Sequence, residues 1–372
     1  MKRTVPDITR RDFLAATAAG ATFPRITLSG KGPETSAKVA MLHATDLFRP
    51  HNDPDDHWDL ACVYALAHRG DIDLKGILID YPPKDGDPDV MAVAQMNFIT
   101  GLAVPVIVGS PPPSKGHRDS EPPAGQSDDA LMVLDVLRQS TLPVVINITG
   151  SSRDVAAAAK KAPDLFAEKC AAIYLNAGAG TSDKTLASKL EFNVSLDPAA
   201  YAAIFNVPCP LYWMPCFEQM QSPWLVREFG TYYRFRQDEI LGRLSDKMQN
   251  YFAYALGKVN NANWLQYLTG SKDERLLAEH GGNYRNMWCT GGFLRAAGKT
   301  VSCSGEIVSL NSEGVSPVFT FDPIKVRCGD DGVTEWAMDD KSKDRYIFHV
   351  RDVENYESAM TAAMKSLLMS LP

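Results

Sequence analysis

The chain has 372 residues, of which 45% are hydrophobic, and its formal net charge at pH 7 is −7. This length suffices for one large α/β domain or two smaller ones. The acidic balance, with no basic block beyond the first residues, argues against nucleic acid or an anionic membrane surface as partner. The sequence has no apolar run long enough to span a bilayer.

The first residues carry the pattern of an export signal. Thr-Arg-Arg-Asp-Phe-Leu at residues 9–14 leads into a mildly apolar stretch of small residues at 15–22. Paired arginines before such a stretch are typical of twin-arginine signals, whose substrates generally cross the membrane folded. A frayed basic N-terminus is the alternative. We therefore predict a signal and leader at residues 1–36, a domain at 37–372, and a periplasmic or secreted bacterial protein.

Strands and helices are expected to alternate from residue 38 onward. The predicted strands are 38–44, 73–79, 104–108, 143–148 and 171–175, and the predicted helices are 55–68, 89–102, 128–138 and 151–161. Alternation at these lengths predicts an α/β fold with a doubly wound, mostly parallel sheet. The polar loop at 115–127 could be an active-site flap or a surface excursion.

The second half of the chain adds to this sheet in our interpretation. Residues 223–278 have a helical pattern and predict a helical insertion over the site. Extended pieces at 316–321, 325–328 and 346–350 predict a small C-terminal β addition, and 355–368 a closing amphipathic helix.

Seven cysteines show no C-x-x-C spacing of the kind that metal sites use. The odd number leaves at least one thiol unpaired within the chain. Cys209 and Cys216 could pair after export, but buried thiols are the favoured interpretation for most of the seven.

An acidic stretch at residues 43–59 follows the first predicted strand. Its aspartates are Asp46, Asp53, Asp55, Asp56 and Asp59. Like charges this close repel, so solvent, a helix dipole or a bound cation must compensate. Several carboxylates at the carboxyl end of a strand suit a hard cation such as Ca²⁺. The alternative is an acidic N-cap with solvated neighbours.

Two other loops are expected at the same edge of the sheet. Thr-Gly-Ser-Ser at 149–152 and Asn-Ala-Gly-Ala-Gly at 176–180 follow later strands, and ligands of doubly wound sheets bind beyond the carboxyl ends of strands. His43, His51 and His57 surround the acidic stretch and invite a Zn²⁺ interpretation, but no H-x-x-x-H spacing supports it.

Residues 191–201, Glu-Phe-Asn-Val-Ser-Leu-Asp-Pro-Ala-Ala-Tyr, form the second informative stretch. Asp197 can cap a helix that Pro198 begins. Glu191 and Asn193 lie two apart in a segment expected to be extended, so their side chains should face the same way. A carboxylate and an amide pointing into one crevice suit a polyol, whose hydroxyls donate and accept hydrogen bonds. A polar loop edge is the alternative.

Together these pieces resemble the inosine–uridine-preferring nucleoside hydrolases. That family has a strand followed by Asp-x-Asp-Pro-Gly-x-Asp-Asp, a Gly-Pro-Leu-Thr-Asn turn, a Met-Gly-Gly strand end and a Glu-Phe-Asn-x-x-x-Asp-Pro-x-Ala-Ala segment. This chain has Thr-Asp at 45–46, Asn-Asp-Pro-Asp-Asp at 52–56, Thr-Gly-Ser-Ser-Arg-Asp at 149–154, Asn-Ala-Gly at 176–178 and Glu-Phe-Asn at 191–193, with Asp-Pro-Ala-Ala in register at 197–200. The resemblance is closer to a divergent branch whose acidic loop reads Asn-Glu-Pro-Asp-Asp.

The resemblance implies hydrolysis of the N-glycosidic bond of a nucleoside or related riboside by a water that Ca²⁺ activates. Asp53 falls on the family's base and metal ligand, Asp55 and Asp56 on a pair that reaches the sugar and the metal, and Asp46 on the first aspartate. Arg153 falls on the residue whose carbonyl binds the metal. The implied sites are therefore catalytic Asp53, substrate-binding Asp55, Glu191 and Asn193, and metal-binding Asp46, Asp53, Asp56 and Arg153. Relatives are commonly dimers or tetramers, which implies a homo-oligomer.

The acidic loop departs from the family in length. Five residues between Asp46 and Asn52 are additional, and two residues before the aspartate pair are missing. A register in which Asp59 is the metal aspartate therefore stays open. The family's asparagine after the second strand is replaced by Asp-Tyr-Pro-Pro at 80–83.

The most important departure is Cys289, which stands where a late aspartate completes the family's metal site. A neutral thiol is a poor ligand for Ca²⁺. Thr290, Asn286 or water would have to substitute, or the metal is weak or absent. The second hypothesis is therefore a non-catalytic or altered protein that binds a sugar or nucleoside on the same fold.

Overall fold

The computed structural model describes residues 39–51, 53–82, 86–111 and 128–372. The predicted signal at 1–36, Asn52 and the polar loop at 115–127 lie outside these residues. Among the described residues, no helix combines the length and the apolar character needed to cross a bilayer.

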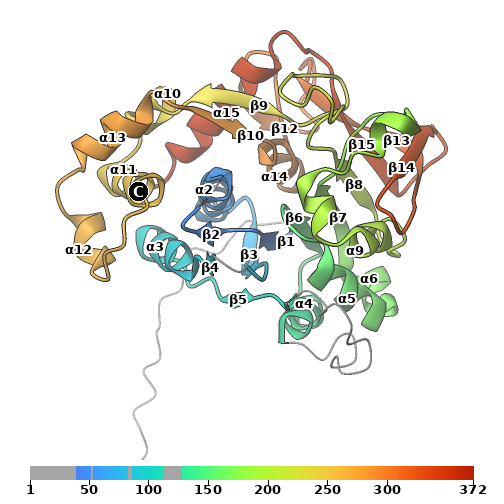
Figure 1. Ribbon diagram of the computed structural model, residues 1–372, viewed down its shortest axis with the longest axis horizontal. Coiled ribbons are helices and arrows are strands. Elements are labelled where there is room, and N and C mark those ends of the chain that lie inside the picture. Colours follow the sequence, from blue (N-terminus) through green and yellow to red (C-terminus); the bar gives the residue numbers. More distant parts are fainter. Residues whose placement is uncertain (1–38, 52, 83–85, 112–127) are drawn as a thin grey trace, which may run out of the picture. The chain divides into compact units, whose positions relative to one another are not determined.

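The centre of the domain is a nine-stranded sheet in the order β14-β13-β15-β8-β7-β6-β1-β3-β5 (Figure 1). Its strands are β1 (Ala40–Thr45), β3 (Asp73–Ile79), β5 (Val106–Val108), β6 (Val144–Ile148), β7 (Cys170–Asn176), β8 (Leu211–Met214), β13 (Phe319–Cys328), β14 (Thr334–Met338) and β15 (Arg345–Val350). From β5 to β15 all neighbours pair in parallel, and β13 and β14 are antiparallel. The predicted mostly parallel sheet is confirmed.

The winding of the sheet places a switch point between β1 and β6. The chain runs outward through β1, β3 and β5, then returns to β6 beside β1 and continues through β7 and β8 in the opposite direction. Ligands of open α/β sheets bind at such a point, because the loops after the two central strands separate there. The acidic stretch and the loop after β6 are the two loops at this point.

Helices surround the sheet. They are α2 (Asp55–His68), α3 (Val90–Thr100), α4 (Asp128–Gln139), α5 (Arg153–Lys161), α6 (Pro163–Lys169), α7 (Lys184–Ala187), α8 (Phe192–Leu196), α9 (Pro198–Ile204), α10 (Asp238–Leu241), α11 (Asp246–Leu256), α12 (Trp264–Thr269), α13 (Glu274–Gly281), α14 (Thr290–Ala296) and α15 (Tyr356–Leu368). Met41 and Leu42 belong to different hydrophobic clusters. Successive residues of β1 thus point into separate cores, as expected for a strand covered on both faces.

Helix α2 carries the acidic stretch into the core. Every residue from Asp56 to Ala67 is buried, so this helix is covered on all sides rather than amphipathic. Trp58 stacks on Phe252 of α11 with the ring centroids 4.0 Å apart. This packing fixes the first turn of α2, and with it the aspartates of that turn.

The stretch at 223–278, predicted to be helical, contains α10, α11, α12 and most of α13, together with strand β9 (Tyr233–Arg236). The four helices form one group beside α2 and α3 in Figure 1. The Tyr251 hydroxyl of α11 donates a hydrogen bond to the carbonyl of His57 in α2 (3.2 Å). Strand β9 pairs with β10 (Tyr284–Met287) outside the main sheet.

The C-terminal strands differ from expectation in one respect. Residues 316–321 and 325–328 were expected to be separate pieces, but β13 is one strand that passes through Pro323. Phe319–Pro323 pairs with β15, whereas Ile324–Cys328 pairs with β14. Because the strand changes partner at Pro323, the missing N–H of proline falls where the ladder changes. The remaining short sheets join β2 (Phe48–Arg49) to β4 (Asp87–Pro88) and β11 (Lys299–Val301) to β12 (Ile307–Ser309).

Candidate functional site

A cavity of about 950 Å³ opens at the switch point of the sheet. Asp46 follows β1, Thr149 follows β6 and Asn176 ends β7, and all three line the cavity. The three loops predicted at one edge of the sheet therefore meet in one place. We call this cavity the main pocket.

Three aspartates form what we call the acidic group: Asp56, which is buried, and Asp46 and Asp55, which are partly exposed. All three line the main pocket. Burial raises the pKa of each carboxyl well above its usual range, and the other carboxylates raise it further. The Thr45 hydroxyl donates a hydrogen bond to Asp56 Oδ1 at 2.5 Å. Such mutual repulsion destabilises the charged forms unless protons or a cation offset it.

Asp80 adds a fourth carboxylate that sequence analysis did not count as a site residue. It follows β3, is 3% exposed, and accepts a hydrogen bond from the backbone N–H of Ser151. Burial raises the pKa of Asp80, and its charge in turn raises the pKa of Asp46. The position was visible in the sequence as the replacement of the family's asparagine.

Asp53 stands apart from the acidic group. Its side chain lines the main pocket but is 48% exposed. The Arg285 guanidinium of β10 forms an ion pair with it, with Nη2 and Oδ1 2.5 Å apart. The residue predicted to be base and metal ligand is therefore bound to a cationic side chain that the sequence pattern did not indicate.

Asp59, the alternative metal aspartate, lies beneath the pocket. It is fully buried, and neither of its carboxylate oxygens has a hydrogen-bond partner in the described part of the chain. Burial raises the pKa of Asp59 to about 7, and the Cys289 thiol partly opposes this. Cys289 in turn donates to Asn176 Oδ1 at 3.2 Å. The cysteine at the position of the late aspartate is thus a buried neighbour of Asp59.

Glu191 and Asn193 line the pocket, but not for the reason expected. The segment is not extended: Glu191 is the N-cap of α8, and Asn193 lies in its first turn. Glu191 accepts hydrogen bonds from the backbone N–H groups of Gly178 and Asn193, both at 2.9 Å. The Asn193 amide donates to the carbonyls of Thr149 (3.1 Å) and Asn176 (3.2 Å). The pair therefore ties α8 to the ends of β6 and β7.

Arg153 does not line the main pocket. It is the first residue of α5, and its guanidinium donates to the carbonyls of Ser110 (3.1 Å) and Leu196 (3.4 Å) and lies 3.5 Å from Asp197. The structure therefore gives the Arg153 side chain a role in joining α5 to the α8–α9 segment, and the carbonyl role stays a prediction.

Aromatic side chains line the main pocket together with the acidic group, and we call them the aromatic wall. The wall consists of Phe48, Phe192, Phe217, Trp224 and Trp288. Phe217 makes edge-to-face contacts with Trp224 (5.3 Å between centroids) and Trp288 (5.8 Å). Phe192 and Trp224 are more than half exposed. Aromatic faces of this kind suit a planar ring.

The donors in the pocket favour a hard cation over zinc. His43 is fully buried against Phe293, and burial lowers its pKa to about 3. Within the described ranges, no group of three or more His, Cys, Asp or Glu side chains is placed so that it could hold a metal ion. The donor chemistry nevertheless fits an oxygen-liganded cation, because positive charge would relieve the repulsion among the carboxylates of the acidic group.

Comparison with known proteins identifies the family and the fold. The profile of the inosine-uridine preferring nucleoside hydrolase family matches residues 52–269, which is more than half of the chain. A purine-preferring ribonucleoside hydrolase from Gardnerella vaginalis has a similar structure (TM-score 0.54, 16% identity, covering 89% of this chain and 99% of that one). A plant nucleoside hydrolase also has a similar structure (TM-score 0.53, 16% identity, covering 89% of this chain and 99% of that one). Among curated proteins, the sequence search finds no significant match.

Proposed function

This chain belongs to the inosine-uridine preferring nucleoside hydrolase family, and on that basis we propose that it hydrolyses the N-glycosidic bond of a nucleoside or related riboside in the main pocket. The proposal includes a Ca²⁺ held by the acidic group and, from the twin-arginine pattern, a place of action outside the cytoplasm. Family membership supports glycosidic hydrolysis in general. The substrate, the ion and the location are the proposed parts.

The observation that carries the proposal is one pocket with three kinds of lining. The acidic group, the Glu191–Asn193 pair and the aromatic wall all line the same cavity. A riboside has the matching parts: a sugar that develops positive charge, vicinal hydroxyls and a planar base. The carboxylates would stabilise the oxocarbenium-like transition state.

The acidic group would hold the cation through carboxylate oxygens. When bound, a divalent cation there supplies Lewis acidity, lowering the pKa of a nearby water and orienting sugar hydroxyls. Asp46 is the base we assign, because it directly follows β1 and belongs to the acidic group. Burial and the charges of Asp80 and Asp55 raise its pKa. A raised pKa brings a carboxylate closer to the value that suits a general base.

The Glu191–Asn193 pair would hold the sugar hydroxyls. The Asn193 amide already donates to two carbonyls, so its oxygen is left to accept from a hydroxyl. Glu191 accepts two backbone N–H groups and still has lone pairs for a hydroxyl donor. Phe217 and Trp288 would stack on the leaving base.

The second candidate function is ligand binding without turnover. Cys289 favours it, because a thiol at the position of the late aspartate removes one oxygen ligand. The test is release of ribose from a panel of nucleosides with added Ca²⁺, with Asp46→Asn as the inactive control. Release that depends on Asp46 supports the hydrolase, whereas nucleoside binding without any release supports the second function.

A further inference from the structure

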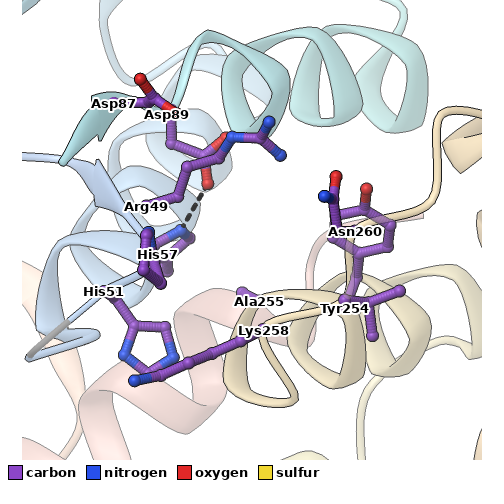
Figure 2. Close-up of a pocket in the computed structure, with 11 residues that line it drawn as sticks. Arg49, His51, His57, Asp87, Asp89, Tyr254, Ala255, Lys258 and Asn260 are labelled. Atoms are coloured by element: carbon purple, nitrogen blue, oxygen red, sulfur yellow. Dashed lines mark hydrogen bonds and ion pairs between the residues drawn. The ribbon is translucent and has the colours of Figure 1, made fainter. Parts of the chain in front are cut away.

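A second, smaller cavity adjoins the main pocket. It has a volume of about 280 Å³ and shares Pro50 and His51 with the main pocket. Figure 2 shows it between the β2–β4 side of the domain, which contributes Arg49 and Asp89, and the end of α11, which contributes Lys258. We call it the side pocket.

The two pockets differ in charge. The main pocket collects carboxylates, whereas the side pocket is lined by the basic residues Arg49 and Lys258. Neither the Arg49 guanidinium nor the Lys258 ammonium has an ion-pair partner among the described residues. In Figure 2 the Arg49 side chain extends across the cavity, and the Lys258 side chain runs along its opposite wall beside His51.

The side pocket also holds imidazoles with unused nitrogens. His57 is 1% exposed; its Nε2 is hydrogen-bonded to Asp89 Oδ2 at 3.0 Å, and its Nδ1 has no partner in the described residues. Neither ring nitrogen of His51 has a hydrogen-bond partner of good geometry in the described residues, although the backbone of Ala255 and Leu256 lies next to the ring.

The acidic residues of this cavity are accounted for. Asp89 is the N-cap of α3 and accepts hydrogen bonds from His57 and from the backbone N–H of Ala92 (3.1 Å). Asp87 is exposed, and Figure 2 shows it at the edge of the cavity on the far side from Lys258. Arg49 acts on Asp89 only through its charge and forms no ion pair with it. Arg49, Lys258 and the unpaired Nδ1 of His57 therefore remain for a ligand.

We infer that the side pocket binds a phosphate group, and that the ligand spanning the two pockets is a phosphorylated riboside. Arg49 and Lys258 would neutralise the phosphate oxygens through charge-assisted hydrogen bonds. The imidazoles would bond its remaining oxygens or its P–OH. The carboxylates next door would repel the phosphate, so the charge pattern admits only one orientation of such a ligand. The second half of this inference rests on the proposed function.

Calorimetric titration of the full chain with inorganic phosphate, in the presence of a metal chelator, tests the first half. Saturable binding is expected, and Arg49→Gln or Lys258→Asn should weaken it about tenfold. Asparagine is chosen because Lys258 has φ +50°, a backbone conformation that asparagine tolerates. Lys325→Gln replaces an exposed lysine of β13 and is the matched control. This variant should bind phosphate as the unmodified chain does. Absence of saturable binding, or unchanged binding in the double variant, would overturn the phosphate site.

Titration with inosine and with inosine 5′-monophosphate tests the second half. The monophosphate should bind about tenfold more tightly than inosine, and this advantage should vanish in the Arg49→Gln, Lys258→Asn double variant. Equal affinities would overturn the phosphorylated riboside while leaving the phosphate site standing. The Glu191→Ala variant should bind inosine and inosine 5′-monophosphate more weakly but should still bind inorganic phosphate. This result would confirm that the two pockets act separately.

Discussion

The Arg285 guanidinium and the Asp53 carboxylate form an ion pair, with Nη2 and Oδ1 2.5 Å apart, that joins β10 to the acidic stretch. The two residues are 232 positions apart in the chain. The positive charge of Arg285 also counteracts the raised pKa of Asp55. Asp53 therefore lines the main pocket as the partner of Arg285. We propose that the catalytic carboxylate belongs to the acidic group instead.

Replacing the two aspartates separately tests this assignment. Asp46→Asn removes the proposed base and should lower kcat at least about 10³-fold, the order expected for loss of a general base. Asp53→Asn breaks a half-exposed ion pair and should lower kcat less than about tenfold. Ribose release measured for both variants decides between them. A larger loss for Asp53→Asn would restore the assignment made from the sequence.

The Asp53–Arg285 pair should contribute little to global stability. One partner is 48% exposed and the other 12%, and ion pairs with solvent access contribute about 1 kcal/mol or less. A double-mutant cycle with Asp53→Asn and Arg285→Gln, measured by urea unfolding, gives the coupling free energy. A coupling above about 3 kcal/mol would contradict this prediction, since only a buried pair reaches such values.

Gly178 should resist substitution. Its φ is +86°, and a Cβ there would meet the Tyr201 hydroxyl. Its N–H also donates to Glu191 at 2.9 Å. Gly178→Ala should therefore lower the free energy of unfolding by about 2–3 kcal/mol, from strain and overpacking. Gly298→Ala is the control, because it has a similar φ of +72° but nothing within 4 Å of the added Cβ. Equal losses in the two variants would contradict a role for the Tyr201 contact.

Asp322 should make stability depend on pH in the acid range. Burial alone would raise its pKa, but hydrogen bonds from His349 (2.7 Å) and Thr320 (2.8 Å) and the charge of Arg351 lower it overall. A carboxyl whose pKa is lower in the folded state stabilises the fold above its ordinary pKa. That stabilisation is lost as the pH falls through the folded value.

The matching measurement compares Asp322→Asn with the unmodified chain by urea unfolding at pH 6 and pH 3. The variant should be less stable at pH 6 by about 2 kcal/mol, the order of a hydrogen bond to a charged group. The difference should shrink at pH 3. A difference that stays constant between the two pH values would show that the carboxylate charge is not what stabilises β13 against β15.

The first half of the fold follows closely from the sequence. Helix α2 and strand β3 have the predicted bounds, because Pro54 precedes the helix and each element contains a run of apolar residues. The carboxyl ends of β1 and β6 bring the acidic stretch beside Thr149 as a parallel sheet requires. These features depend on local pattern and on the topology of parallel strands.

What the sequence did not reveal depends on distant contacts. Arg285 reaches Asp53 only because β9 and β10 pair outside the main sheet. The segment of Glu191 and Asn193 was expected to be extended, but only Glu191 is, because its carboxylate caps helix α8 and accepts a hydrogen bond from Gly178. The favoured prediction of buried thiols is confirmed for five of the seven cysteines. The contacts of these thiols were not predicted: Cys170 and Cys209 interact, and Cys216 donates to Asn176 (3.5 Å).

Calorimetric titration with Ca²⁺, of the unmodified protein and of an Asp46→Asn, Asp56→Asn variant, tests whether the acidic group binds the ion that the proposed hydrolysis needs. The acidic group predicts binding of about micromolar affinity or tighter, as in oxygen-liganded calcium sites, and its loss in the variant. Asp53→Asn should keep most of the affinity. No binding to the unmodified protein would contradict a metal-dependent hydrolase and leave a ligand-binding member of the family.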